Sequence, residues 1–196
     1  MAKLSVRTIL FGAVMLLYWL YPVYLIRSND RILREGVAYR FRLRPVDPVD
    51  AFRGRYIALA IEQDQALAPD FAQDDIATRQ GYVSIGVDSA GFAYPLFFTE
   101  AIPAGEDYLP VMAYGRLDQR VNIAYPESMQ YYFLNEKLGP LADEYYREFT
   151  SSADTTRQGA YLDVRILSGK AVIEELYFDG RPVGAFLREK LALQPQ

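Results

Sequence analysis

The first pattern along the chain is a long apolar segment without charge, residues 8–26, with the sequence TILFGAVMLLYWLYPVYLI. Nineteen helical residues extend about 28 Å, close to the ~30 Å hydrocarbon core of a bilayer. Aromatic residues gather toward its C-terminal end, as at membrane interfaces; they are Tyr18, Trp19, Tyr21 and Tyr24. The segment predicts a transmembrane anchor. A cleaved signal peptide is the alternative, although no small-x-small cleavage site follows the apolar run.

After the anchor, the period of the pattern changes. Residues 27–36 keep helical potential, which Gly36 can end. Residues 37–45 then alternate with a period of two, apolar and basic in turn from Tyr39 to Arg44, which predicts a half-buried strand. The two sides of this strand are Tyr39, Phe41 and Leu43 against Arg40, Arg42 and Arg44.

Short apolar runs separated by turn residues predict further strands at 54–61, 82–87, 92–98, 109–117 and 120–125, and the hairpin turns Ser168-Gly169 and Asp179-Gly180 predict more at the C-terminal end. Residues 129–134 form an apolar and aromatic segment. Residues 139–152 predict a helix, and the polar residues 62–78 predict a loop or a short helix. The expected fold is mainly β (α+β): a transmembrane helix followed by one antiparallel β-rich domain with one or two short helices.

The pattern therefore divides the chain into four parts. They are a basic flank (1–7), the anchor (8–26), a juxtamembrane neck (27–36) and a β-rich extramembrane domain (37–196).

Composition narrows the chemistry open to this domain. The chain has no His and no Cys, which excludes an imidazole base, a Ser-His-Asp triad, a thiol nucleophile and His- or Cys-ligated metals. Residues 27–55 hold eight arginines and four acids, whereas residues 56–196 carry a net charge of −10. An acidic body argues against nucleic acid as a partner. We expect no cofactor and no metal.

The stretch that links the first two strands resembles the bacterial GDYXXLXY family, named for Gly-Asp-Tyr-x-x-Leu-x-Tyr. Here the block is RPVDPVDAFRGRYIALAI, in which Gly54, Tyr56 and Leu59 match, while Arg55 replaces Asp and Ile61 replaces the last Tyr. The segments YGRLDQRVNIAYPESMQYYF, YYFLNEKLG (with Glu136 matching) and LDVRILSGKAVIEELYFDGRPV are similar too. The likeness covers most of residues 37–183. It implies a short N-terminal anchor with one extramembrane domain, often encoded beside polytopic membrane proteins, and no assigned activity.

The arginine stripe Arg40, Arg42 and Arg44 is the first candidate site, because guanidinium groups about 7 Å apart on one face suit an anionic contact. The structural alternative is cross-strand pairing with the acidic residues 62–75 or with Asp163.

The family block supplies a second set of positions: Asp47, Asp50, Arg53, Gly54, Arg55, Tyr56, Leu59 and Glu136. Asp47 and Asp50 fit turn-forming residues beside prolines better than paired acid and base groups. Gly54 suits the entry into a strand, and Tyr56 suits the rim of a core.

A remote enzymatic hypothesis rests on Ser128 as a nucleophile with Lys137 or Lys170 as its base, since a Ser-Lys pair needs no His. Such a lysine has to be desolvated. We expect instead a non-enzymatic accessory or interaction module that contacts a polytopic membrane protein. Binding of an anionic ligand or envelope component by the arginine stripe is the alternative.

The flanking charges do not agree on orientation. Lys3 and Arg7 favour a cytoplasmic N-terminus, whereas Arg27, Arg31 and Arg34 favour the opposite, and simple counting leans toward a cytoplasmic body. Part of the arginine count belongs to the strand, and folded domains cross despite flanking charge. We therefore expect a single-pass protein of the bacterial inner membrane with an extracytoplasmic body.

Overall fold

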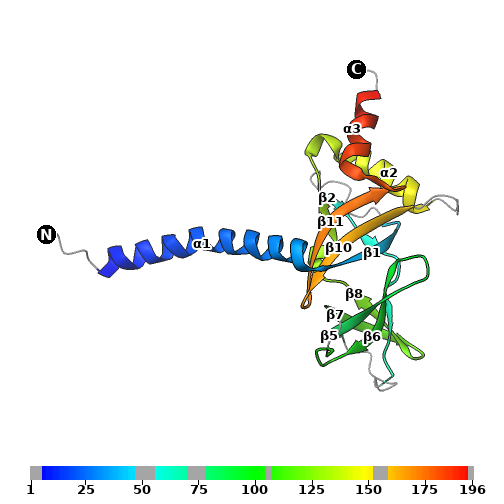
Figure 1. Cartoon of the computed structure of the whole chain (residues 1–196), viewed down its shortest axis with the longest axis horizontal. Helices are drawn as coiled ribbons and strands as arrows, with labels where there is room; N and C mark the ends of the chain where they lie inside the picture. Colours follow the sequence, from blue (N-terminus) through cyan, green and yellow to red (C-terminus); the bar gives the residue numbers. More distant parts are fainter. Residues whose placement is uncertain (1–5, 47–55, 70–77, 105–106, 152–158, 194–196) are drawn as a thin grey trace.

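The computed structural model describes residues 6–46, 56–69, 78–104, 107–151 and 159–193. A long helix, α1 (Val6–Glu35), stands out from a β-rich body (Figure 1). The body follows α1 directly in the chain and holds two further α-helices among the described residues. The predicted fold class is confirmed.

Helix α1 runs without a break through the predicted anchor and neck, so the prediction that helical structure continues to Gly36 is confirmed. Its stretch Leu10–Glu35 is long and apolar enough to cross a membrane, and no part of its most apolar window is buried in the body. Pro22 lies inside the helix. Apolar side chains along α1 are exposed, Trp19 for example to 74%.

The junction between α1 and the body has no linker, because β1 (Val37–Arg44) begins two residues after the helix ends. Ile32, in the last turns of α1, is only 4% exposed. The amide of Gly36 donates to the Ile32 carbonyl (2.8 Å), and Nη1 of Arg165 donates to the Gly36 carbonyl (3.3 Å). Burial in the body and hydrogen bonding to β10 therefore begin at the end of the helix.

Strand β1 lies next to one edge of a five-stranded sheet. The order of this sheet is β12 (Arg181–Pro182), β11 (Lys170–Phe178), β10 (Ala160–Leu167), β1 and β3 (Ala60–Ile61). All of these pairs are antiparallel. The predicted alternation of β1 is confirmed, since Phe41 and Leu43 are buried while the arginines are exposed.

Five strands close into a small barrel. They are β4 (Gln65–Leu67), β6 (Ala93–Thr99), β5 (Arg79–Val87), β7 (Tyr108–Leu117) and β8 (Arg120–Ala124). The pairing of β4 with β6 is parallel, and the other barrel pairs are antiparallel.

Strand β4 corrects the interpretation of residues 62–78 as a loop or short helix. Only Ala66 of this strand is buried, between two half-buried neighbours, so the local pattern is too short to show a period of two. Residues 65–67 form a strand because they pair with β8 and β6, and their own sequence pattern does not predict one.

The predicted strand 54–61 is divided between two sheets. Its first part is β2 (Tyr56–Ala58), which pairs with β9 (Tyr131–Phe133), and its second part is β3, which pairs with β1. Leu59 lies between them and donates its amide to the Gln130 carbonyl at 2.8 Å.

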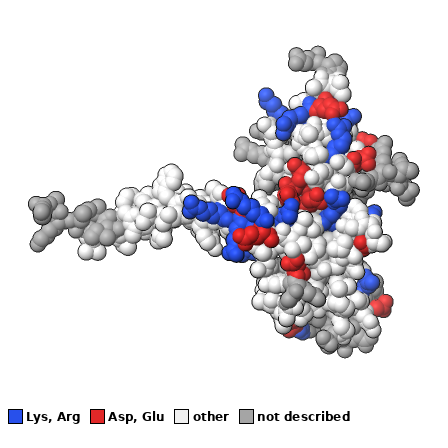
Figure 2. All heavy atoms as spheres, in the orientation of Figure 1, with Lys and Arg blue, Asp and Glu red and all other residues white. Residues whose placement is uncertain are grey.

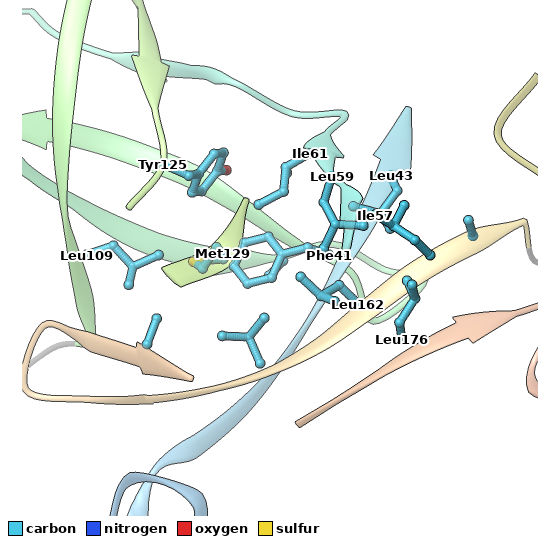
Figure 3. Packing of buried hydrophobic residues seen from close by; sticks show 14 of the residues in the cluster. Phe41, Leu43, Ile57, Leu59, Ile61, Leu109, Tyr125, Met129, Leu162 and Leu176 are labelled. Carbon is cyan, nitrogen blue, oxygen red and sulfur yellow. The ribbon is translucent and has the colours of Figure 1, made fainter. Parts of the chain in front are cut away.

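One hydrophobic core joins the sheet to the barrel (Figure 3). Phe41 of β1 points into its centre, where its ring meets that of Tyr125 edge-on at 5.8 Å. Met129, in the 3-10 helix η1 (Glu127–Met129), and Leu162 of β10 are both almost completely buried beside it. Sheet and barrel therefore form one unit.

The far end of the sheet is covered by α2 (Gly139–Ser151), which follows the short 3-10 helix η2 (Glu136–Leu138), and by α3 (Val183–Leu193). Aromatic rings make this contact: Phe149 stacks on Phe178 at 5.4 Å, and Phe186 meets Phe178 edge-on at 5.9 Å. The helix predicted at 139–152 is confirmed; α3 had no counterpart in the sequence prediction.

Gly36 makes the close junction between helix and sheet possible, and its replacement is therefore expected to be destabilising. A Cβ atom there would lie 2.5 Å from the Ile32 carbonyl oxygen and 3.0 Å from that of Ile166. Gly36→Ala is expected to lower the free energy of unfolding by about 1–3 kcal/mol, measured on the full chain in detergent.

Gly184→Ala is the matched control, since its added Cβ meets only Arg188 at an ordinary 3.4 Å within α3. If Gly36→Ala changed the free energy of unfolding no more than Gly184→Ala does, the close approach at Gly36 would be contradicted.

Candidate functional site

The arginine stripe lies on the outward face of β1, as predicted, but two of its three guanidinium groups are engaged by acids. Nε of Arg40 lies 3.0 Å from a carboxylate oxygen of Asp163, its cross-strand neighbour on β10. Nη2 of Arg44 lies 2.9 Å from Asp64. The hydrogen bond to Asp163 is the main cause of the raised pKa of Arg40. These pairs match the structural alternative of cross-strand pairing.

Arg42, the middle residue of the stripe, has a different environment. Its guanidinium carbon lies 4.1 Å from the centroid of the Phe92 ring, a cation–π contact, and the described part of the chain gives it no ion pair. Arg40 also covers a ring, that of Tyr161, at 4.5 Å. The stripe is therefore built into a network of rings and acids, and its guanidinium groups do not converge on one pocket.

Tyr161 extends this network across the sheet. Its ring stacks on that of Tyr177 in β11, with centroids 4.9 Å apart and planes inclined by 10°.

The ion pairs of the stripe contribute little stability by comparison. The carboxylates that pair with Arg40 and Arg44 remain partly exposed, and exposed pairs of this kind contribute under ~1 kcal/mol each. Aromatic packing is thus the larger stabilising part of this face.

A buried tyrosine fixes the end of the strand that carries the stripe. The hydroxyl of Tyr146, in α2, donates to the Arg44 carbonyl at 2.8 Å and accepts from the Ala60 amide at 3.3 Å. Tyr146 is 3% exposed, and burial raises its pKa to about 12. The neutral phenol thus ties α2 to β1 and β3 at once.

The family block is only partly within the described residues: Asp47, Asp50, Arg53, Gly54 and Arg55 lie outside them. Tyr56 is described, and its ring meets Tyr131 edge-on at 4.9 Å and Phe133 at 5.9 Å. Leu59 is buried in the core. The described motif positions therefore join β2 to β9 and to the core, which is a structural role.

Ser128 and Lys137 are on separate short helices, η1 and η2, and both side chains are exposed. An exposed lysine lacks the desolvation that a Ser-Lys mechanism needs. Glu136, the other predicted position in this region, begins η2. The geometry gives the hydrolase hypothesis no support.

The architecture and the motif positions together agree with a family model that matches residues 18–176, described as GDYXXLXY protein. The chain belongs to the GDYXXLXY family. No curated protein and no solved structure matches it. The membership agrees with the resemblance carried by Tyr56 and Leu59 and by the closing hairpin.

Sequence reasoning missed two open clefts on the barrel of this GDYXXLXY protein. One, of about 700 Å³, is polar and includes Glu62, Asp64, Asp88 and Arg120 in its lining. The other, of about 670 Å³, lies between η1 and strands β5 and β7. Neither has a signal in the linear pattern, because each is lined by residues from at least three separate segments. Within the described residues, no three acids are arranged to hold a metal ion.

Removal of the Tyr146 hydroxyl is expected to weaken the support of the stripe. Tyr146→Phe leaves the Ala60 amide and the Arg44 carbonyl without this partner, which should reduce the free energy of unfolding by about 1–2 kcal/mol in urea denaturation.

Tyr145→Phe serves as its control. Tyr145 lies in the same helix and contacts Phe186 through its ring at 4.9 Å, so this variant keeps the ring contact and should change stability much less. Equal losses in the two variants would argue against the role assigned to the Tyr146 hydroxyl.

Proposed function

We propose that this GDYXXLXY protein is a membrane-anchored interaction module that contacts a polytopic membrane protein of the bacterial inner membrane. The single observation that carries the proposal is the junction without a linker, in which α1 continues into β1 through the closely packed Gly36. A flexible linker is sufficient for a domain that only needs to be retained at a membrane. A domain fixed to its anchor presents the same face to the same neighbour.

The length of the helix supports a protein neighbour over the lipid surface. Residues 27–35 continue α1 by about 14 Å beyond the apolar segment. The headgroup layer of one leaflet is only about 5–8 Å thick. The body of an upright molecule is thus held just above the headgroups, at the level where the extramembrane parts of a polytopic protein lie.

The surface at the neck is consistent with this position. Figure 2 shows basic and acidic side chains gathered where α1 meets the body. Arg31 pairs with Glu35 at 2.7 Å one turn apart, and both side chains are exposed. Such a hydrated, charged collar suits a segment outside the hydrocarbon core.

Orientation is the first part of the proposal to test. Alkaline phosphatase, which is active only outside the cytoplasm, and green fluorescent protein are fused in turn to the C-terminus of the full chain. An extracytoplasmic body predicts high phosphatase activity from the first fusion and dark cells from the second. Fluorescent cells without phosphatase activity would reverse the orientation.

The partner is tested by quantitative co-purification of the tagged full chain from native membranes in mild detergent. We expect enrichment of a polytopic membrane protein with the natural chain. We also expect strong loss of that enrichment when a flexible Gly-Ser linker of eight residues separates α1 from β1, because the body then no longer faces its neighbour.

A tagged α1 without the body controls for association through the helix alone. If the linker variant enriched the partner as strongly as the natural chain does, the rigid junction would not be needed for the contact. No stable partner with any version would count against the interaction module as a whole.

A further inference from the structure

The cleft of about 670 Å³ beside η1 has an apolar floor that the fold leaves open. We call it the η1 cleft; its lining includes Tyr82, Pro110, Met112, Ala124, Pro126 and Glu127. Its volume is in the range of binding clefts in proteins.

The apolar floor follows from the alternation of the barrel strands. Leu109, Val111 and Ala113 of β7 point into the core, so Pro110 and Met112 between them point outward. In register, Pro110 faces Tyr82 of β5 and Met112 faces Ala124 of β8. Outward positions on an antiparallel barrel strand are usually polar, and here three neighbouring strands place apolar side chains together instead.

Met112 gives this floor an adaptable centre. Its side chain is 37% exposed, and an unbranched thioether can fit partner side chains of several shapes. Tyr82 is held firmly by comparison, since its ring meets Tyr108 edge-on at 5.5 Å. An ordered ring beside a flexible thioether suits a protein side chain inserted between them.

The rim of the η1 cleft adds a charge. Glu100 is bridged to Arg79 at 2.7 Å, so its carboxylate is engaged. Glu127 is exposed, and the described part of the chain gives it no ion pair. The rim therefore presents one uncompensated carboxylate above an apolar floor, which complements an apolar segment with a Lys or Arg.

The cleft is connected to α1 through one strand. Strand β11 contacts the end of α1, η1 and β7, so two of the elements that line the cleft contact the same strand as α1 does. A neighbour in the membrane is thus within reach of the cleft. The lipid surface is a poor occupant, because a free carboxylate is repelled by anionic headgroups.

We propose that the η1 cleft docks an extramembrane segment of the polytopic partner, with apolar side chains against Met112 and Tyr82 and a Lys or Arg opposite Glu127. This inference rests on the proposed function and names its contact surface.

The test places a photocrosslinking benzoylphenylalanine at Met112 in the full chain within native membranes. The control position is Phe97, on β6, which is exposed to 46% and outside the cleft. We expect a crosslink from position 112 whose mapped peptide belongs to an extramembrane segment of a polytopic protein and contains apolar residues with Lys or Arg. Position 97 should give at least tenfold less.

Charge reversal provides the second arm. Glu127→Lys should lower the yield from position 112 about fivefold, whereas Glu62→Lys, the same change at an exposed site outside this cleft, should leave it unchanged. Thermal unfolding of each variant verifies that the body is folded.

Each contrary result has a separate meaning. Equal crosslinking from positions 112 and 97, crosslinks to lipid alone, or no effect of Glu127→Lys would overturn the docking site. If the partner still co-purifies in that case, the protein remains an interaction module, but the η1 cleft is not its contact surface. Loss of both crosslink and co-purification would overturn both.

Discussion

The close approach of α1 to the sheet at Gly36 is the constraint on which the rest of the architecture depends. With no side chain at this position, the last turn of the helix, the start of β1 and the Ile166 carbonyl of β10 meet within contact distance. Ile32 is buried at the same place. Strand β1 pairs with β10 on one side and with β3 on the other, so its placement bears on both neighbours.

The shared core carries this constraint into the barrel. Phe41 extends from β1 toward Tyr125 and Met129. Tyr125 directly follows β8, the last strand of the barrel, and Met129 lies in η1. The Tyr125 hydroxyl donates to the Gln63 carbonyl at 2.7 Å, so the segment before β4 is held by the same side chain. The sheet and the barrel are therefore packed through one continuous core.

The sequence predicted the features that repeat over several residues. Alternation in residues 37–45 identified β1 and the side of it that bears Arg40, Arg42 and Arg44, because each residue adds to a period of two. Single residues whose contacts are tertiary give no repeating pattern. Ala66 is the one buried position of β4. The Tyr146 hydroxyl is hydrogen-bonded to carbonyl and amide groups that are far away in the chain. The pairing of Asp163 with Arg40 was among the alternatives, but its choice depends on strand register, which the linear pattern does not define.

The place of β1 in the chain order bears on how the protein is made. Strand β1 pairs with β10, with Val37 opposite Ile166, so this pairing joins residues far apart in sequence. Synthesis proceeds from the N-terminus, so α1 and β1 are complete long before β10 exists. During that interval β1 lacks its partner strand β10, and it carries Arg40, Arg42 and Arg44, charges of the kind with which natural unpaired strands discourage wrong pairing.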